Sequence, residues 1–425
     1  MRILKLGSVG PSVQLLQLAL GRAGTAALEL DGIFGAKTRD AVMHFQSDNG
    51  LSAEGIVGQQ TTRALMPYYT GYAVHRVHRG DTLFSIAKMH NAELSAILTA
   101  NPSISAENLQ IGSSVIVPLP FDIVPTNIAF TSALVSYCVR GIAARYPSVK
   151  SGRVGTSVMG SPLWFLAIGS GSNRVFYNAS HHANEWITTP VVLRFFELLA
   201  RAAAQNGSIF GHSAQELINA ASVYIAPCVN PDGVDLVTGE LTSGEYYQSA
   251  VKIARDYPAI PFPSGWKANI RGTDLNLQYP AGWEQARENK FAQGFVSPAP
   301  ADYVGSAPLS APESRAMYDF TLSLSPKLIL AYHTQGKVIY WRYLDYEPAG
   351  SREIADTFAA VSGYAVEDTP YASGFAGYKD WFIQNFNRPG YTIEAGIGQN
   401  PLPISQFDEI FSDNLGILTL APLLI

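Results

Sequence analysis

The feature that most constrains the fold is a series of apolar runs that alternate with amphipathic segments over residues 124–425. Runs such as LWFLAIG, RVFYNAS and KLILAYH are apolar almost throughout, as expected of strands buried on both faces. The segments between them have a helical period, as in WITTPVVLRFFELLARAAA. The alternation predicts an α/β domain with a mixed, largely parallel sheet flanked by helices. Ligands of such sheets bind at the carboxyl ends of the strands.

The chain of 425 residues is longer than one such domain needs, so we expect two or three domains. Near its start, DGIFGAKTRDAV (31–42) returns as EGIVGQQTTRAL (54–65). Each copy has a glycine-bracketed turn that leads into a helical pattern, and another helical pattern, PSVQLLQLAL, precedes both. Residues 1–68 are therefore predicted to form a small three-helix bundle.

Residues 72–120 have a different pattern, in which a strand is followed by two short helices and a second strand. Asp81 is the expected N-cap of the first of these helices. The segment also contains His75, His78 and His90, which we expect to be solvated surface residues rather than metal ligands. Prolines after this unit indicate a stiff linker into the α/β domain, 124–425.

Composition excludes several functional classes. A formal net charge of −5 provides no electrostatic footprint for nucleic acid. The longest apolar stretches, LILAY and LGILTLAPLLI, are far shorter than the ~20 residues of a membrane-spanning helix. Cys138 and Cys228 could pair, but two thiols make no disulfide scaffold, and we expect them to be free and buried. The sequence does not indicate an oligomeric state.

The stretch SHHANEWITTP (180–190) follows the apolar run RVFYNA and is the first candidate for a metal site. His182 and Glu185 are three residues apart, so on one helical turn their side chains are neighbours. The same spacing from His181 reaches Asn184, a poor zinc ligand. We therefore predict His182 and Glu185 as metal ligands and His181 as a neighbouring pocket residue.

A catalytic zinc site needs a third protein ligand and an open position, and two histidines with one glutamate are an established set. His333 ends the apolar run KLILAYH, which places it at the carboxyl edge of the predicted sheet. Alone, His333 would be interpreted as a core histidine. Together with His182 and Glu185, it completes the predicted ligand set for one Zn²⁺ ion.

These motifs resemble the zinc metallocarboxypeptidases of the carboxypeptidase A type. HHANEWITTP is similar to the family's H-x-x-E-W-I-T stretch, and NPDG, DLNLQ, AYHTQG and YTIEAG follow in the family's order. The resemblance covers most of residues 124–425. It implies that His182, Glu185 and His333 bind zinc and that Glu394 is the general base and acid. It also places Arg271 as the cation that stabilises the charged oxygen of the reaction intermediate.

The resemblance also implies a set of substrate-binding residues: Asn276, Leu277, Tyr371 and His181. Tyr371 is similar to the mobile tyrosine that closes over substrate. Leu277 departs from the family pattern, because exopeptidases have an arginine there that binds the terminal carboxylate of the substrate in a bidentate fork. Leucine cannot do this, so the site should not require a chain end.

The N-terminal segments have resemblances of their own. The helical repeat of residues 3–66 resembles the peptidoglycan-binding module of wall hydrolases, and residues 72–119, with GDTL and a final V-P, resemble a LysM domain. A carboxypeptidase-like domain with such modules resembles the γ-D-glutamyl-L-diamino acid endopeptidases. The implied partners are peptidoglycan glycan and its stem peptides.

Two alternatives to this endopeptidase remain open. One is a carboxypeptidase that trims stem peptides, with Arg388 or Lys379 replacing the missing arginine. The other is an inactive scaffold that binds the cell wall, and the retention of every chemical part of the site argues against it. The N-terminus contains no apolar core of a signal peptide, so we expect cytoplasmic residence before release, as in a sporulating cell.

Overall fold

The computed structural model describes residues 3–105 and 108–425. Residues 1–2, at the start of the first predicted domain, and 106–107, inside the second, lie outside the described residues. The chain divides into two compact units. One comprises Met1–Ile128 and Ser136–Lys150, and the other comprises Ala129–Val135 and Ser151–Ile425.

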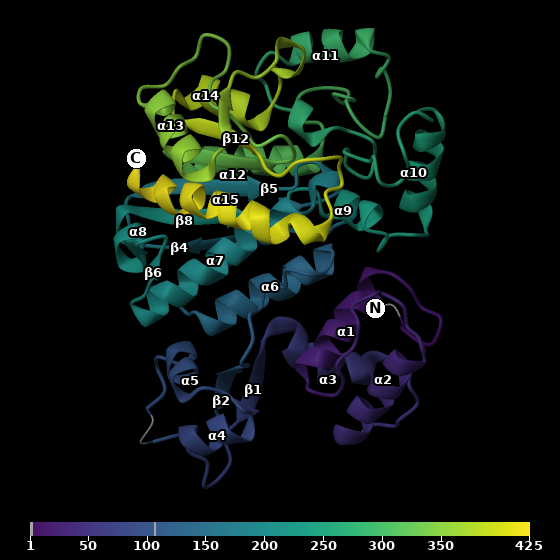
Figure 1. Ribbon diagram of the computed structural model, residues 1–425, viewed down its shortest axis with the longest axis vertical. Helices are drawn as coiled ribbons and strands as arrows, with labels where there is room; N and C mark the ends of the chain where they lie inside the picture. Colours follow the sequence, from purple (N-terminus) through teal and green to yellow (C-terminus); the bar gives the residue numbers. More distant parts are fainter. Residues whose placement is uncertain (1–2, 106–107) are drawn as a thin grey trace. The chain divides into compact units, whose positions relative to one another are not determined.

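The first unit begins with the three predicted helices (Figure 1): α1 (Pro11–Arg22), α2 (Ala36–Asp48) and α3 (Gln59–Thr70). A buried glutamine of the preceding helix stabilises each copy of the repeated turn. Gln17 Oε1 accepts a hydrogen bond from the backbone N–H of Gly32 at 3.0 Å. Gln46 Oε1 accepts one from Gly55 N–H at 2.9 Å in the second copy. The two copies of the repeat therefore form equivalent turns, and in each turn a buried glutamine accepts the hydrogen bond of one backbone N–H.

The same unit contains the predicted strand–helix–helix–strand segment, whose elements are β1 (Tyr72–Arg76), α4 (Leu83–Met89), α5 (Leu94–Ala100) and β2 (Ser114–Pro118). The two strands pair antiparallel, and the apolar side chains of all four elements form one small core.

The predicted cap of α4 was wrong. Thr82 is the N-cap residue, and it exchanges hydrogen bonds with Ser85 in a capping box. Asp81 is used differently, because its Oδ2 lies 2.9 Å from His75 Nε2 and accepts the backbone N–H of His78. The expectation that all three histidines here are solvated was also wrong, since His75 is only 8% exposed.

The second unit is built on an eight-stranded mixed sheet of order β11-β10-β12-β9-β5-β8-β4-β3. Its strands are β3 (Lys150–Thr156), β4 (Pro162–Ile168), β5 (Asn173–Ala179), β8 (Ala221–Ala226), β9 (Leu328–His333), β10 (Val338–Tyr340), β11 (Ala365–Glu367) and β12 (Gly390–Glu394). The central strands β8, β5, β9 and β12 run parallel, whereas β4 and β10 are antiparallel to their neighbours β8 and β12. The predicted mixed, largely parallel sheet is confirmed.

Helices cover both faces of this sheet (Figure 1). The helices of this unit are α7 (Thr188–Gln205), α8 (Ala214–Ala220), α9 (Pro231–Val237), α10 (Glu245–Arg255), α11 (Trp283–Ala292), α12 (Pro312–Leu324), α13 (Ser351–Ser362), α14 (Tyr378–Phe386) and α15 (Phe407–Leu420). Another helix, α6 (Ser132–Arg145), is divided between the two units. Adjacent residues of β5 show the two layers, because successive side chains of a strand point to opposite faces. The ring of Phe176 contacts Phe320 of α12, and that of Tyr177 contacts Phe195 of α7.

Two further expectations concern the chain as a whole. Cys138 and Cys228 are buried thiols, as predicted. Among the described residues, no helix combines the length and apolar character needed to cross a membrane. Because β5, β9 and β12 run parallel, their carboxyl ends meet at one edge of the sheet.

Candidate active site

The first two predicted ligands lie on the turn that connects β5 to α7. Ser180 follows the strand with a positive φ of 53°, and its backbone N–H donates to Thr188 Oγ1 at 3.1 Å. The chain then forms a single 3₁₀ turn, η1 (Ala183–Glu185), before α7 begins. As the three-residue spacing predicts, the imidazole and the carboxylate meet: His182 Nδ1 is 2.9 Å from Glu185 Oε1.

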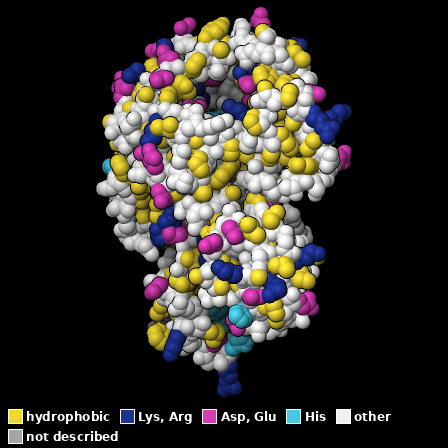
Figure 2. Space-filling view, turned by 45° about the vertical axis from the view of Figure 1, so that its right-hand side comes forward, with side chains coloured by type: hydrophobic (Ala, Val, Ile, Leu, Met, Phe, Trp, Pro, Cys, Tyr) yellow, Lys and Arg dark blue, Asp and Glu magenta, His cyan; other side chains and the backbone are white. Residues whose placement is uncertain are grey.

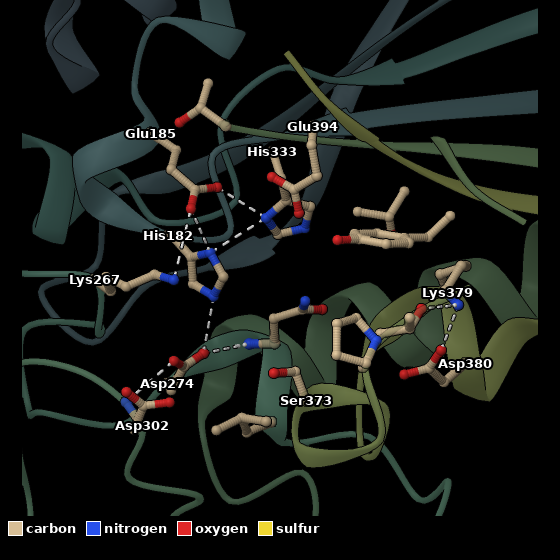
Figure 3. A pocket seen from close by; sticks show the side chains of 18 of the residues that line it. His182, Glu185, Lys267, Asp274, Asp302, His333, Ser373, Lys379, Asp380 and Glu394 are labelled. Atoms are coloured by element: carbon tan, nitrogen blue, oxygen red, sulfur yellow. Dashed lines mark hydrogen bonds and ion pairs between the residues drawn. The ribbon is translucent and has the colours of Figure 1, made fainter. Parts of the chain in front are cut away.

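The third predicted ligand comes from the neighbouring strand. β9 pairs in parallel with β5, and His333 is its last residue. His333 Nδ1 lies 2.8 Å from Glu185 Oε2 and 3.2 Å from His182 Nδ1. The structure thus brings together side chains from two segments 151 residues apart (Figure 3). All three side chains are buried.

The donor set of these three residues fits a metal ion. One ligand atom from each lies within 4.8 Å of the others. Two imidazole nitrogens face each other beside a carboxylate, and a cation between them would satisfy both lone pairs as well as the negative charge. Two histidines and one glutamate are the ligands of an established class of catalytic zinc site. The group could therefore hold a divalent metal ion.

The charges of the cluster support this assignment. Burial works against ionisation of Glu185, but His182 and His333 outweigh it and hold the pKa of this carboxyl well below its usual range. Burial lowers the pKa of His333, so its imidazole favours the neutral form that binds metals. His181 is fully buried, and its desolvation lowers its pKa still further. Burial also opposes the charge of His182, but Glu185 and Asp274 outweigh it and raise the pKa of this imidazole to about 9. The site therefore combines an ionised carboxylate and a neutral His333 with a His182 whose extra proton a metal ion would displace.

Asp274 contacts His182 from the other side of the ring. Its Oδ1 lies 3.1 Å from His182 Nε2, and it also accepts the backbone N–H of Asn276 at 3.0 Å. A proton on Nε2, donated to Asp274, leaves the lone pair of Nδ1 directed at the cluster. Despite its burial, the pKa of Asp274 is lowered because His182 and Lys267 stabilise its charge. Sequence reasoning missed Asp274, although it is the acidic residue of the DLNLQ motif.

The cation beside the His–Glu–His cluster is Lys267, whereas the predicted Arg271 lies elsewhere. Lys267 Nζ lies 3.8 Å from Glu185 Oε1 and lines the same pocket. Burial opposes its charge, but Glu185 and Asp274 raise its pKa above the usual value. Arg271 is exposed and lines a separate hollow with Tyr246. The sequence offered Lys267 as well, because it directly follows the tryptophan of GWKANIRG and is four residues before Arg271.

Glu394 reaches the cluster from a third strand. It ends β12, where it is paired in register with His333 of β9. Its carboxylate projects into the pocket across from Glu185 (Figure 3). Burial, followed by the charge of Glu185, raises the pKa of Glu394 to about 8. A carboxyl with a raised pKa that lines a cleft is a candidate proton carrier.

The pocket has a volume of about 260 Å³. The space-filling view shows a hollow in this face of the molecule, with basic and acidic side chains at its edge (Figure 2). Asn276 and Leu277, two of the residues predicted to bind substrate, line the pocket. Asn276 is held in place by its Oδ1, which accepts the backbone N–H of Tyr378 at 2.9 Å. Leu277 presents an apolar surface that is 8% exposed.

The other two predicted substrate-binding residues lie outside this pocket. Tyr371 is 67% exposed, packs edge-on against Phe375 and lines a neighbouring hollow, while Pro370 and Ser373 face the pocket itself. His181 is fully buried, and its Nε2 is 3.1 Å from the hydroxyl of Tyr279. Its ring also lies nearly parallel to that of His333. His181 therefore supports a predicted ligand without facing the pocket.

The NPDG motif holds the two segments of the site together. Asn230 Nδ2 donates to the carbonyl of His181 at 3.1 Å and to that of Ala268 at 3.0 Å. Its Oδ1 caps α9 by accepting the N–H of Gly233. One side chain thus fixes the His181–His182 turn against the segment that carries Lys267. This explains the motif in physical terms, because Asn230 is fully buried and its amide needs several partners.

Two ion pairs line the wall of the pocket away from the ligands. Lys379 Nζ is 2.7 Å from Asp380 Oδ1 and donates to the carbonyl of Arg342 at 2.6 Å. Lys290 Nζ is 2.5 Å from Asp302 Oδ1. Of the two residues considered as substitutes for the missing arginine, only Lys379 faces the pocket. Arg388 instead donates to the carbonyls of Ser325 and Pro326.

A His–Glu–His cluster with a second carboxylate and a lysine, at the carboxyl edge of a mixed α/β sheet, defines a metallopeptidase. Comparison with known families gives the same class and names it. The family model for zinc carboxypeptidases matches residues 136–416, and the chain belongs to this family. Residues 9–65 match a putative peptidoglycan binding domain, and residues 75–118 match the LysM domain.

Characterised and uncharacterised relatives cover the catalytic region. Gamma-D-glutamyl-L-diamino acid endopeptidase 1 of Lysinibacillus sphaericus is 45% identical over 279 residues, which are 66% of this chain and 68% of that protein. The uncharacterized protein YqgT of Bacillus subtilis is 39% identical over 283 residues, covering 66% of this chain and 73% of YqgT. Among solved structures, bovine thrombin-activatable fibrinolysis inhibitor has the same fold, with a TM-score of 0.54 at 20% identity, over 70% of this chain and 98% of that one.

Proposed function

We propose that the chain is a zinc-dependent endopeptidase that hydrolyses the γ-D-glutamyl–diamino acid bond of peptidoglycan stem peptides. The observation that carries the proposal is Leu277. It lines the pocket directly after Asn276, where the resemblance to exopeptidases leads us to expect an arginine. A site without that guanidinium has no fork for a terminal carboxylate. The 45% identity to an enzyme named for this activity supports the same substrate.

The proposed chemistry follows from the positions of the side chains. His182, Glu185 and His333 would hold Zn²⁺, which when bound polarises a carbonyl and lowers the pKa of water to about 7. Glu394 accepts a proton from the attacking water and returns it to the nitrogen of the leaving amine as the amide C–N bond breaks. Lys267 provides a positive charge for the oxygen that becomes negative during attack. Asp274 keeps His182 in the tautomer that binds metal.

The positive charge of a bound ion would also lower the pKa of Glu394. Without metal, burial and the charge of Glu185 keep this carboxyl protonated at neutral pH. A divalent cation beside it favours the ionised form, because an opposite charge nearby stabilises a carboxylate. Binding of the metal would therefore convert Glu394 into a base near neutral pH.

The N-terminal domains supply the second part of the proposal. Segments that match peptidoglycan-binding and LysM domains would hold the enzyme on its polymeric substrate. Tethering raises the local concentration of the stem peptide at the active site without any new contact there. We propose that the chain acts on the cell wall, in its turnover or in sporulation, after cytoplasmic residence.

A carboxypeptidase that trims stem peptides is the second candidate, and Lys379 is the observation that favours it. Its ammonium group lines the pocket and could meet a substrate carboxylate. However, the group is 4% exposed and already bound by Asp380, Arg342 and Thr369. A lysine whose charge is already paired and whose N–H groups are already hydrogen-bonded binds a substrate carboxylate more weakly than a free guanidinium would.

Mass spectrometry of L-Ala-γ-D-Glu-diaminopimelate-D-Ala incubated with the zinc-loaded protein tests the proposal. Release of L-Ala-D-Glu is expected, with its loss in Glu394→Gln. Glu367→Gln, which changes an exposed glutamate on β11, is the matched control and should leave cleavage unchanged. Release of D-Ala alone would replace the endopeptidase with the carboxypeptidase, and an intact peptide would contradict both.

A further inference from the structure

A second polar cluster lies in the LysM domain. Its histidines were predicted from the sequence to be solvated surface residues. His75 is on β1, His78 and Asp81 are in the turn that follows, and His90 is the C-cap of α4. His75 is 8% exposed and His90 is half-buried, while His78 is open to solvent. Histidine side chains gather beside acidic ones low on the face shown in Figure 2.

The carboxylate of Asp81 is the centre of this cluster. Its Oδ2 lies 2.9 Å from His75 Nε2 and 3.7 Å from His78 Nδ1. The same oxygen accepts the backbone N–H of His78 at 2.7 Å, which fixes its position relative to the turn. One ligand atom from each of the three residues lies within 4.8 Å of the others. Within the described residues, the catalytic His–Glu–His group is the other set with this property.

The separations fit ligands of one small ion. Nitrogen and oxygen ligands bind zinc at about 2.1 Å, so two of them on a tetrahedral ion are about 3.4 Å apart. The distances from Asp81 Oδ2 to the two imidazole nitrogens, 2.9 and 3.7 Å, lie on either side of that value. The longer one exceeds the range of a hydrogen bond, so the nearby nitrogen of His78 is not explained by a direct bond to Asp81.

His90 would orient the imidazole ring of His75. His75 Nδ1 lies 3.1 Å from His90 Nε2. When Nδ1 donates its proton to His90, the opposite nitrogen of His75 directs a lone pair at Asp81. A histidine that binds a metal commonly donates its other ring N–H to a neighbouring acceptor in this way. In that tautomer a lone pair of His75 Nε2 faces one of Asp81 Oδ2 at 2.9 Å, and a cation bound to both would relieve their repulsion.

We propose that His75, His78 and Asp81 form a second metal site, which binds a divalent transition-metal ion, with zinc as the ion that its ligands favour. Two neutral imidazoles and one carboxylate carry a net charge of −1 and match the nitrogen and oxygen preference of Zn²⁺. Because His78 is 76% exposed, water can reach the fourth position. The site joins the end of β1 to the turn before α4, so the ion would stabilise this small domain rather than take part in peptide hydrolysis.

The metal content of the full-length protein tests the proposal. After dialysis against dilute Zn²⁺, mass-spectrometric metal analysis should give two ions per chain. His182→Gln and His78→Gln should each lower this to one, and the double variant should retain none. His44→Gln, an exposed histidine on α2, is the matched control and should keep two. One ion in the wild type with none in His182→Gln would overturn the proposal.

A thermal measurement separates the two sites independently of activity. In the His182→Gln protein, Zn²⁺ should still raise the unfolding temperature of the N-terminal unit, and adding His78→Gln should abolish that rise. An equal rise in both proteins would contradict the site. His78→Gln should cleave a short soluble stem peptide at the wild-type rate, because its side chain is exposed and belongs to the other unit.

Discussion

Asp274 Oδ1 lies 3.1 Å from His182 Nε2, on the side of the imidazole ring that faces away from Glu185. This contact favours the tautomer of His182 that the proposed metal site requires. With a metal ion bound and its one remaining proton on Nε2, His182 would direct the lone pair of Nδ1 toward the point where His333 and Glu185 converge. The acidic residue of the DLNLQ motif is therefore as much a part of the proposed metal site as the ligands.

Asp274→Asn should weaken zinc binding by about 10- to 100-fold, because residues that orient metal ligands have effects of this size. The amide can donate where the carboxylate only accepts, so it no longer enforces the required tautomer. Competition with a chromophoric chelator measures the affinity. Asp302→Asn, which changes another aspartate of the same pocket that pairs with Lys290, is the control and should leave affinity near wild type. Equal losses in both variants would indicate a general electrostatic effect.

Lys267 rather than Arg271 should be needed for turnover. Removal of a donor that stabilises an oxyanion typically lowers kcat about 10²- to 10³-fold. We expect that loss for Lys267→Met, partial activity for Lys267→Arg, and nearly wild-type kcat for Arg271→Met, because Arg271 faces a separate hollow. Steady-state kinetics on the tetrapeptide measures all three. A large loss in Arg271→Met alone would restore the original prediction.

The convergence of His182, Glu185 and His333 was predictable from sequence because their positions follow from local geometry. A three-residue spacing on one turn fixes how His182 meets Glu185, and a histidine that ends a buried strand must emerge at the sheet edge. Glu394 was predicted only from the family resemblance, and its place beside His333 depends on the register of β12 with β9, which no local pattern sets. Periodicity and strand direction are properties of short segments, so the sequence determines them well.

The cation could not be predicted in this way, because Lys267 and Arg271 lie in a loop without periodicity. Tertiary contacts decide which one reaches the pocket: Lys267 O accepts the N–H of Ala183, and Asn230 binds the carbonyl of the next residue. Local competition explains the wrong cap of α4. Both Asp81 and Thr82 are good N-caps, and the contact between Asp81 and His75 leaves the role to Thr82.

Leu277→Arg should shift the enzyme toward substrates with a free C-terminus. The new guanidinium would enter a pocket wall where an apolar side chain now lies, and it could pair with a terminal carboxylate. We expect the ratio of kcat/KM for a free-acid peptide to that for its C-terminal amide to rise by about tenfold or more. Leu277→Met, which preserves volume without charge, should leave the ratio unchanged. An unchanged ratio in the arginine variant would remove Leu277 as the basis of endopeptidase action.

Asp235 of α9 should make stability depend on pH. Desolvation raises the pKa of its carboxyl to about 7, even though Ser132 donates hydrogen bonds to both oxygens. In the unfolded chain the carboxyl ionises near pH 4. Between these values the folded state keeps a proton that the unfolded state releases, so this contribution to stability is present below pH 4 and lost as pH rises through 7. Because the side chain is partly exposed, we expect a loss of about 1–3 kcal/mol.

The comparison with Asp235→Asn isolates this effect from all other titrations. The amide resembles the protonated carboxyl but does not ionise, so the stability of the variant relative to wild type should improve steadily from pH 5 to pH 8. Urea unfolding at several pH values measures the difference. Asp256→Asn, at the exposed end of α10, should show no such trend. If the difference between Asp235→Asn and wild type stays constant with pH, the carboxyl is already ionised in the folded protein at pH 5, and its hydrogen bonds with Ser132 then outweigh its desolvation.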